Sequence, residues 1–118
     1  MTSYDFIIDL LYPLELRQRK MFGVDAYYIE DKMVFALREK NHNIIDNGIW
    51  IATTKQHHQK LKHTFKTIKP IETIGIKSWL MLPASSDIFE YEVQLLVHLI
   101  RMRSPLIGII PKSQISKK

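Results

Sequence analysis

Residues 19–39, RKMFGVDAYYIEDKMVFALRE, carry the strongest β-strand signal in this chain. β-branched and aromatic side chains are frequent in it, and such residues favour strands. The polar pair Glu30-Asp31 separates two apolar runs, which predicts a β-hairpin. Gly23 interrupts the first run and indicates a bulge or a tight turn. The centre of the predicted fold is therefore an antiparallel sheet.

Three segments around this region repeat apolar residues at helical spacing and predict amphipathic helices. The first lies in residues 3–16 and should end at Pro13, because the residue before a proline disfavours helical backbone. The second covers residues 55–67. The third begins near Asp87 and ends before Ser104.

Shorter strands complete the sheet. Residues 49–53 predict one strand, and residues 74–82 predict one or two more. Residues 106–110 are either a last short strand or an apolar tail that folds onto the body. The expected order is α-β-β-β-α-β-α. We therefore expect an α+β fold, a two-layer sandwich with a mostly antiparallel sheet and helices packed on one face.

The composition is that of one globular domain. The chain has 118 residues, of which 46% are apolar and 25% charged, and this excludes a disordered chain, a coiled-coil rod and a two-domain enzyme. We expect a single domain over residues 1–112 and a disordered tail over residues 113–118. The absence of cysteine excludes disulfides and thiolate metal sites. No signal peptide or membrane segment is expected, so the prediction is a cytoplasmic protein.

The run from residue 19 to residue 37, followed by Gly48-Ile49-Trp50-Ile51-Ala52, resembles the N-terminal domain of the TfoX family of bacterial proteins. The resemblance covers about residues 4–70. Its motif residues are Met21, Phe22, Gly23, Phe35, Ala36 and Leu37. The resemblance implies a small antiparallel α+β domain. It also implies a link to regulation, because the best-known members are positive regulators of competence for DNA uptake.

The net charge of +5 is concentrated in residues 47–71, which contain five lysines and no acidic residue. At about 100° per residue, a helix places much of this charge within one arc. That stripe comprises Lys55, His58, Lys62 and Lys66, and Lys69 would extend it. One interpretation is a face that binds the phosphates of a nucleic acid, without reading bases. The other is a solvated face that keeps the protein in solution.

Arg17, Arg19 and Lys20 form a second basic cluster just before the Phe22-Gly23 turn. In an extended segment Arg19 and Met21 share one face, and Lys20 and Phe22 share the other. One interpretation is an edge strand protected by charge. The other joins these residues to the lysine helix as one basic surface.

Other residue patterns indicate no specific chemistry. The clustered histidines at positions 57, 58 and 63 are not spaced at i, i+4, so we expect no metal site. No nucleophile or phosphate-loop motif is present, and we expect no catalytic residue and no cofactor. Asp87, Glu90 and Glu92 are interpreted as charges at a helix entry. Trp50 and Trp79 are interpreted as core or interface residues.

Three functions remain as hypotheses. The first is a non-enzymatic regulatory or interaction domain that binds a macromolecular partner, such as another protein, through a sheet edge or the lysine face. Self-association through an edge formed by residues 106–110 is one form of it. The second is sequence-independent nucleic-acid binding through the lysine-rich helix. The third is a small enzyme or ligand-binding domain.

Overall fold

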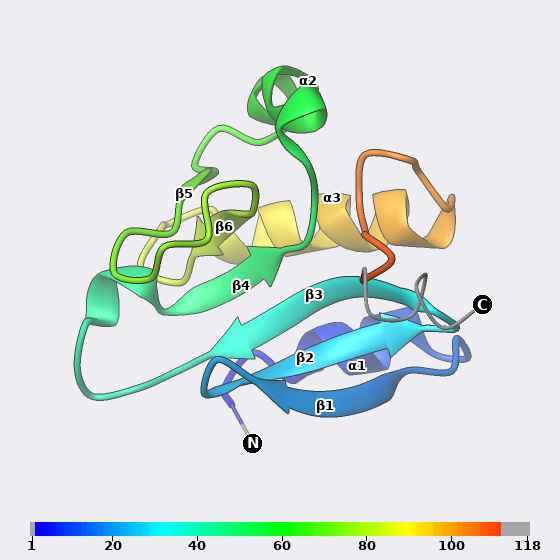
Figure 1. Ribbon diagram of the computed structural model, residues 1–118, viewed down its shortest axis with the longest axis horizontal. Helices are drawn as coiled ribbons and strands as arrows, with labels where there is room; N and C mark the ends of the chain where they lie inside the picture. Colours follow the sequence, from blue (N-terminus) through cyan, green and yellow to red (C-terminus); the bar gives the residue numbers. More distant parts are fainter. Residues whose placement is uncertain (1, 112–118) are drawn as a thin grey trace.

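The computed structural model describes residues 2–111. Six strands form one sheet in the order β1-β2-β3-β4-β6-β5, and every neighbouring pair is antiparallel (Figure 1). The strands are β1 (Arg17–Met21), β2 (Val24–Ile29), β3 (Lys32–Arg38), β4 (Gly48–Ile51), β5 (Lys69–Pro70) and β6 (Leu80–Pro83). The prediction of an antiparallel α+β fold is confirmed, including the hairpin that turns at Glu30-Asp31.

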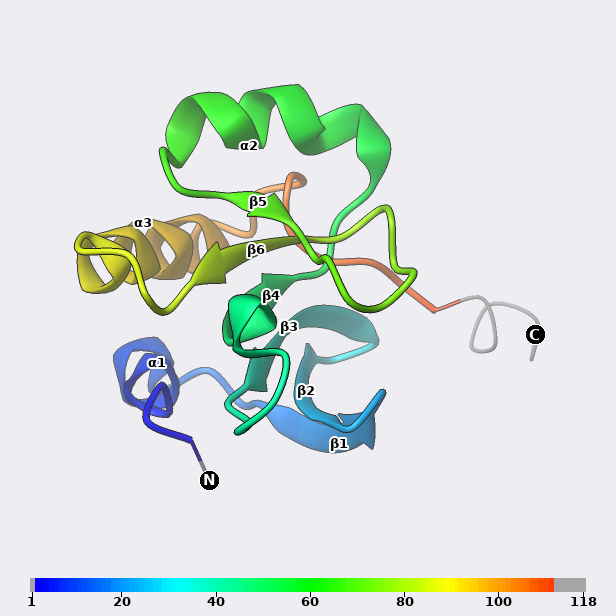
Figure 2. The same ribbon diagram turned by 90° about the vertical axis from the view of Figure 1, so that its left-hand side faces the viewer.

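Three α-helices accompany the sheet: α1 (Phe6–Leu11), α2 (His58–Thr64) and α3 (Phe89–Arg101). Two 3-10 turns, η1 (Ile44–Asp46) and η2 (Lys55–His57), precede β4 and α2. All three α-helices contribute buried side chains to one core, which also contains Phe35, Leu37 and Ile51 of the sheet. The helices therefore cover the same face, as predicted, and Figure 2 shows them around the curved sheet.

The opposite face of the sheet is also buried. It carries Ala26, Tyr28, Ala36 and Trp50, and no element of this second cluster is a helix. The connection between β5 and β6 covers it with Ile71 and Trp79, and Met21 and Ile109 pack at its margins. Both tryptophans are buried, as predicted.

Two buried carboxylates hold the chain around β5. Asp46 accepts hydrogen bonds from the backbone N–H of Glu72 at 2.9 Å, the N–H of Thr73 at 2.8 Å, and the Thr73 hydroxyl. Glu92 accepts hydrogen bonds from the N–H of Lys66 at 2.6 Å, the N–H of Thr67 at 3.2 Å, and the Thr67 hydroxyl. Each carboxylate thus satisfies two consecutive backbone donors and a threonine hydroxyl, which are costly to leave unpaired in the interior.

Glu92 lies in the first turn of α3, in agreement with its interpretation as a charge at a helix entry, and it is also a buried anchor. It also explains why the second helix is shorter than residues 55–67. α2 ends at Thr64, since the N–H groups of Lys66 and Thr67 bond to Glu92 instead of continuing the helix. The helix begins with the 3-10 turn η2, so the regular α-helix starts only at His58.

The interruption at Gly23 is a tight turn between the separate strands β1 and β2, which is one of the two predicted alternatives. One strand boundary differs from expectation. Residues 74–79 form no strand, because this segment lies over the second sheet face. Strand structure in this part of the chain is limited to β5 and β6.

The apolar residues 106–110 fold onto the domain itself. Ile109 forms an isolated antiparallel bridge with Met33, in which each N–H donates to the other residue's carbonyl, at 2.7 and 2.9 Å. Gly108 donates its N–H to the Ala52 carbonyl at 2.6 Å, and the Thr53 hydroxyl donates to the Leu106 carbonyl at 2.7 Å. This segment therefore uses its backbone groups within its own chain. The tail predicted over residues 113–118 lies outside the described residues.

Candidate functional site

The stripe predicted on the second helix is interrupted in the structure. His58 contacts the Ser78 carbonyl through Nε2 at 2.7 Å, so its ring is directed toward the β5–β6 connection. Lys69 lies in β5, is partly buried, and pairs with Glu72 at 3.1 Å. Lys66 follows the helix end. The exposed lysines of this segment are Lys55, Lys60, Lys62 and Lys66.

The two basic clusters do not form one surface. Arg17, Arg19 and Lys20 lie on β1, the first strand in the sheet order. The helix α2 lies toward β5 and β6, at the other end of the sheet, and Figure 1 shows it on the opposite side of the molecule from β1. The hypothesis of a single basic surface is therefore wrong, because the whole width of the sheet separates the clusters.

Within residues 2–111, strand β1 is an edge strand that pairs only with β2. Its last residue, Met21, faces Val24 across a two-residue turn in which Phe22 has φ 55° and Gly23 has φ 76°. Left-handed backbone at both turn positions is typical of two-residue hairpin turns, whose twist matches that of the flanking strands. In such a hairpin the residues on either side of the turn, here Met21 and Val24, form a hydrogen-bonded pair. Alternation along β1 directs the backbone N–H and C=O groups of Gln18 and Lys20 outward, away from β2.

The side chains of β1 divide between the two faces as the predicted alternation requires. Arg19 lies opposite Ala26, and Met21 packs at the margin of the second core cluster. Lys20 lies opposite Asp25 and pairs with its carboxylate at 2.8 Å. Phe22 differs from the prediction, because it belongs to the turn and shares no strand face with Lys20.

The basic groups of β1 differ in how they are held. The Arg17 guanidinium lies over the Tyr28 ring, 4.7 Å from its centre, and donates to the Glu30 carbonyl at 3.2 Å. The hydrogen bond from Lys20 lowers the pKa of Asp25 below its usual value, and Gln18 contributes to the same shift. The Arg19 side chain forms no ion pair or hydrogen bond among residues 2–111, and the residue is exposed. All of β1 except Met21 is exposed.

The remaining residues of the family-like motif are structural. Phe35, Ala36 and Leu37 are buried in the middle of β3, with Phe35 and Leu37 in the helix-facing core and Ala36 in the second cluster. Phe22 and Gly23 are exposed at the tip of the β1–β2 hairpin, and 57% of the surface of Phe22 is accessible.

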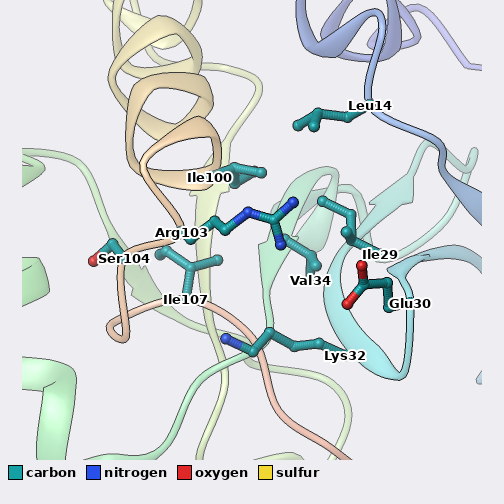
Figure 3. Close-up of a pocket in the computed structure, with 9 residues that line it drawn as sticks. All are labelled: Leu14, Ile29, Glu30, Lys32, Val34, Ile100, Arg103, Ser104 and Ile107. Atoms are coloured by element: carbon teal, nitrogen blue, oxygen red, sulfur yellow. The ribbon is translucent and has the colours of Figure 1, made fainter.

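A cavity of about 220 Å³ opens between the end of α3 and the β2–β3 hairpin. Its apolar wall comprises Leu14, Ile29, Val34, Ile100 and Ile107. Ser104 and three charged residues, Glu30, Lys32 and Arg103, complete the lining. Figure 3 shows the Arg103 side chain reaching across toward Val34 and Ile29. Sequence reasoning missed this site because its residues come from four separate parts of the chain.

The groups with shifted pKa values in the described part of the chain are Tyr4, Asp25, Tyr27 and Asp46. None of the four lines the cavity. Burial raises the pKa of Tyr4 and of Tyr27. Among residues 2–111, no group of three or more histidine, aspartate or glutamate side chains could hold a metal ion. No helix in the described part of the chain is long and apolar enough to cross a membrane.

The comparisons with known proteins add no name to this site. No family model, no curated protein and no solved structure matches the chain. The function is therefore inferred from the geometry of the edge, the lysines and the cavity.

Proposed function

We propose that this chain is a non-enzymatic interaction domain that binds an acidic, extended segment of a partner protein along strand β1. The observation that carries the proposal is an exposed five-residue edge strand in which Arg17, Arg19 and Lys20 are basic and no residue is acidic. An extended peptide can add a strand to such an edge through backbone hydrogen bonds.

The hydrogen-bonding capacity of the edge supports this mode. Gln18 and Lys20 direct backbone donors and acceptors outward, at the spacing that an added strand requires. Edge strands with basic side chains resist pairing with like-charged copies of themselves. An acidic partner segment would instead be attracted on both faces, by Arg17 and Arg19 on one and by Lys20 on the other. Charge therefore selects the partner, and the backbone supplies most of the contacts.

The resemblance to the TfoX N-terminal domain agrees with this proposal. That resemblance implies a regulatory protein, and regulation through a bound partner needs an interaction surface and no catalytic group. The proposal extends it by assigning the surface to β1, directly before the Met21-Phe22-Gly23 motif.

The test measures binding of a fluorescent ten-residue peptide that alternates glutamate and valine. We expect saturable binding that increases the protection of the Gln18 and Lys20 amides from hydrogen exchange. The substitution Gln18→Pro removes an outward N–H and should abolish binding while the domain stays folded. The same peptide with lysine in place of glutamate is the matched control. Equal binding of both peptides, or unchanged binding by Q18P, would contradict the proposal.

A second function rests on a different observation. Lys55, Lys60, Lys62 and Lys66 are exposed around α2, and none of them forms an ion pair with another of residues 2–111. Such a cluster can contact nucleic-acid phosphates without reading sequence. This function predicts duplex binding that falls steeply between about 50 and about 200 mM salt.

Two triple variants with equal charge loss separate the two functions. Alanine at Lys55, Lys62 and Lys66 should abolish duplex binding and leave peptide binding intact. Alanine at Arg17, Arg19 and Lys20 should have the opposite effect. A duplex that does not bind at low salt would exclude the nucleic-acid function.

A further inference from the structure

We propose that the cavity between the end of α3 and the β2–β3 hairpin binds a small monocarboxylate with an apolar body, whose carboxylate pairs with Arg103. No residue of strand β1 and none of the lysines around α2 lines this cavity. The proposal rests on the shape of the cavity, its apolar wall and the placement of its charges.

The wall of the cavity favours an apolar ligand body. Five aliphatic side chains face the space, and they come from the α1–β1 connection, the β2–β3 hairpin, α3 and the segment after it (Figure 3). Val34 and Ile107 are both 3% exposed, and Ile100 is 4% exposed, so the wall belongs to the helix-side core and is preformed. Burying an aliphatic chain against such a wall is favourable by about 0.8 kcal/mol per methylene.

The charged side chains favour an anion. Arg103 and Lys32 contribute two positive charges and Glu30 one negative charge, so the lining carries a net charge of +1 (2 − 1). No ion pair joins any two of these three groups, and Arg103 donates no side-chain hydrogen bond within residues 2–111. A guanidinium presents two parallel N–H donors that match the two oxygens of a carboxylate. One carboxylate group on a ligand would therefore neutralise the net charge of the lining.

Backbone features direct both cations to the cavity. Arg103 has φ 57°, a left-handed conformation that is unusual for a residue other than glycine, and it follows the last turn of α3. Its N–H donates to the Ile100 carbonyl at 3.0 Å, and the Ser104 N–H donates to the Leu99 carbonyl at 3.0 Å. These bonds close the helix end and fix the position from which the Arg103 side chain leaves the backbone.

Lys32 is positioned by Gly108. A β-carbon at Gly108 would lie 2.4 Å from Cδ of Lys32, so the lysine stem occupies space that only glycine leaves free. Gly108 also has φ 101°, a conformation that favours glycine. The approach of the 106–110 segment to β3 thus brings Lys32 to the lining as well as closing the core.

The volume sets the size of the ligand. An apolar cavity of about 150 Å³ holds one benzene ring. The volume here, about 220 Å³, therefore suits a body of roughly eight carbons. A second hollow shares Leu14, Ile29, Glu30 and Arg103 with the cavity and continues toward Pro13 and Arg17. Arg103 stands where the two spaces meet.

The test uses octanoate as the probe, with octanol as its uncharged counterpart, measured by calorimetry and by the methyl NMR shifts of Ile29, Val34 and Ile107. We expect saturable octanoate binding that shifts these methyl signals. Arg103→Gln should weaken octanoate binding at least about tenfold, the equivalent of one charge-assisted hydrogen bond. Arg103→Lys, which keeps the charge but loses the planar donor pair, should bind with intermediate affinity.

Lys60→Gln, which removes a positive charge on α2, is the matched control and should bind octanoate as the wild type does. Arg103 is exposed, so the substitution leaves the core intact and loss of binding cannot reflect unfolding. Equal octanoate affinity of the wild type and R103Q would overturn the proposal. Equal affinity for octanol and octanoate, or no saturable octanoate binding, would also overturn it.

Discussion

The two edges of the sheet differ in how accessible they are to another strand: the β1 edge is open and the β5 edge is closed. At one edge, β1 has five residues, all exposed except Met21, and it directs the backbone groups of Gln18 and Lys20 to solvent. At the other edge, β5 has only two residues, one of which is Pro70 and has no N–H to donate. The chain on either side of β5 is tied down by the buried carboxylates of Glu92 and Asp46.

The two edges thus limit pairing with other strands by different means. β1 does so through the charge of its side chains, and β5 does so through its short length, its proline and the hydrogen bonds that hold the flanking chain. Side-chain charge rejects like-charged strands but admits an acidic one. A two-residue strand that includes a proline offers too few backbone groups to pair with an added strand. The edge at β1 is therefore the one suited to a partner, and the following predictions test the contrast.

The largest effect is expected at the closed edge. Asp46→Ala leaves the N–H groups of Glu72 and Thr73 without their buried acceptor and should lower the free energy of unfolding by roughly 3 kcal/mol. The freed connection should expose Trp79 and accelerate hydrogen exchange over residues 71–79. Urea unfolding measures the loss of stability, tryptophan fluorescence the exposure of Trp79, and amide hydrogen exchange the opening of residues 71–79.

Glu90→Ala, which removes an exposed carboxylate from the first turn of α3, is the control for Asp46→Ala. It should change the free energy of unfolding by less than about 1 kcal/mol. Similar losses in the two variants would show that the closed edge does not depend on the Asp46 hydrogen bonds.

On the β1 edge, a smaller loss of stability should distinguish proline substitutions at the neighbouring residues Arg19 and Gln18. Arg19 directs its N–H inward to β2, so Arg19→Pro should remove a ladder hydrogen bond and cost roughly 1–2 kcal/mol. Gln18→Pro removes an outward N–H and should cost less. Urea unfolding of the two variants measures the difference, and equal costs would mean that the register of β1 is not the one described.

Low pH should reduce the contribution of both edges to the free energy of unfolding. Asp46 holds the chain after β5, and Asp25 pairs with Lys20 of β1. Burial raises the pKa of Asp46, but the hydrogen bonds from Glu72 and Thr73 outweigh it and leave the pKa below its usual value. The Lys20 hydrogen bond lowers the pKa of Asp25. Because both values are depressed in the folded state, these contributions are present above the unfolded pKa of about 3.9 and are lost as pH falls through the folded values.

The measurement is the free energy of unfolding as a function of pH, from neutral pH down to about pH 2. Asp46→Asn and Asp25→Asn should each flatten the decrease below about pH 4, with the larger change for the more buried Asp46. If the free energy of unfolding falls as steeply below about pH 4 in both variants as in the wild type, other carboxylates cause the loss of stability.

The smallest effect is expected at the surface of the closed edge. Glu72 pairs with Lys69 at 3.1 Å, and its side chain is half-exposed. Glu72→Gln should therefore change the free energy of unfolding by less than about 0.5 kcal/mol, and added salt should reduce even that difference. A loss above about 1 kcal/mol would make this ion pair, and not the carboxylate of Asp46, a major constraint on β5.

Local patterns in the sequence were sufficient for the centre of the fold. The pair Glu30-Asp31 between two apolar runs predicted the β2–β3 hairpin, and the apolar spacing after Asp87 predicted α3. The prediction failed where a distant side chain competes for the backbone. Apolar periodicity continued past Thr64, but Glu92, 26 residues from Lys66, accepts the N–H groups that would have extended α2.

The candidate sites were predictable only in part. The basic residues of β1 and of α2 were found from composition, because charge is visible in the sequence. The separation of these two clusters across the sheet could not be predicted from composition, since strand order depends on pairing between distant segments. The cavity residues Glu30, Lys32 and Arg103 carry no shared motif and were missed for the same reason.

The sequence by itself determined the elements that short-range physics controls: apolar periodicity, turn residues and the sign of the charge along each segment. The tertiary structure alone decided which sheet edge stays accessible, that the two basic clusters lie apart, and that Arg103 faces an apolar cavity. The physical reason is that these properties depend on the register of long-range strand pairs and on buried carboxylates whose partners lie far away in the chain.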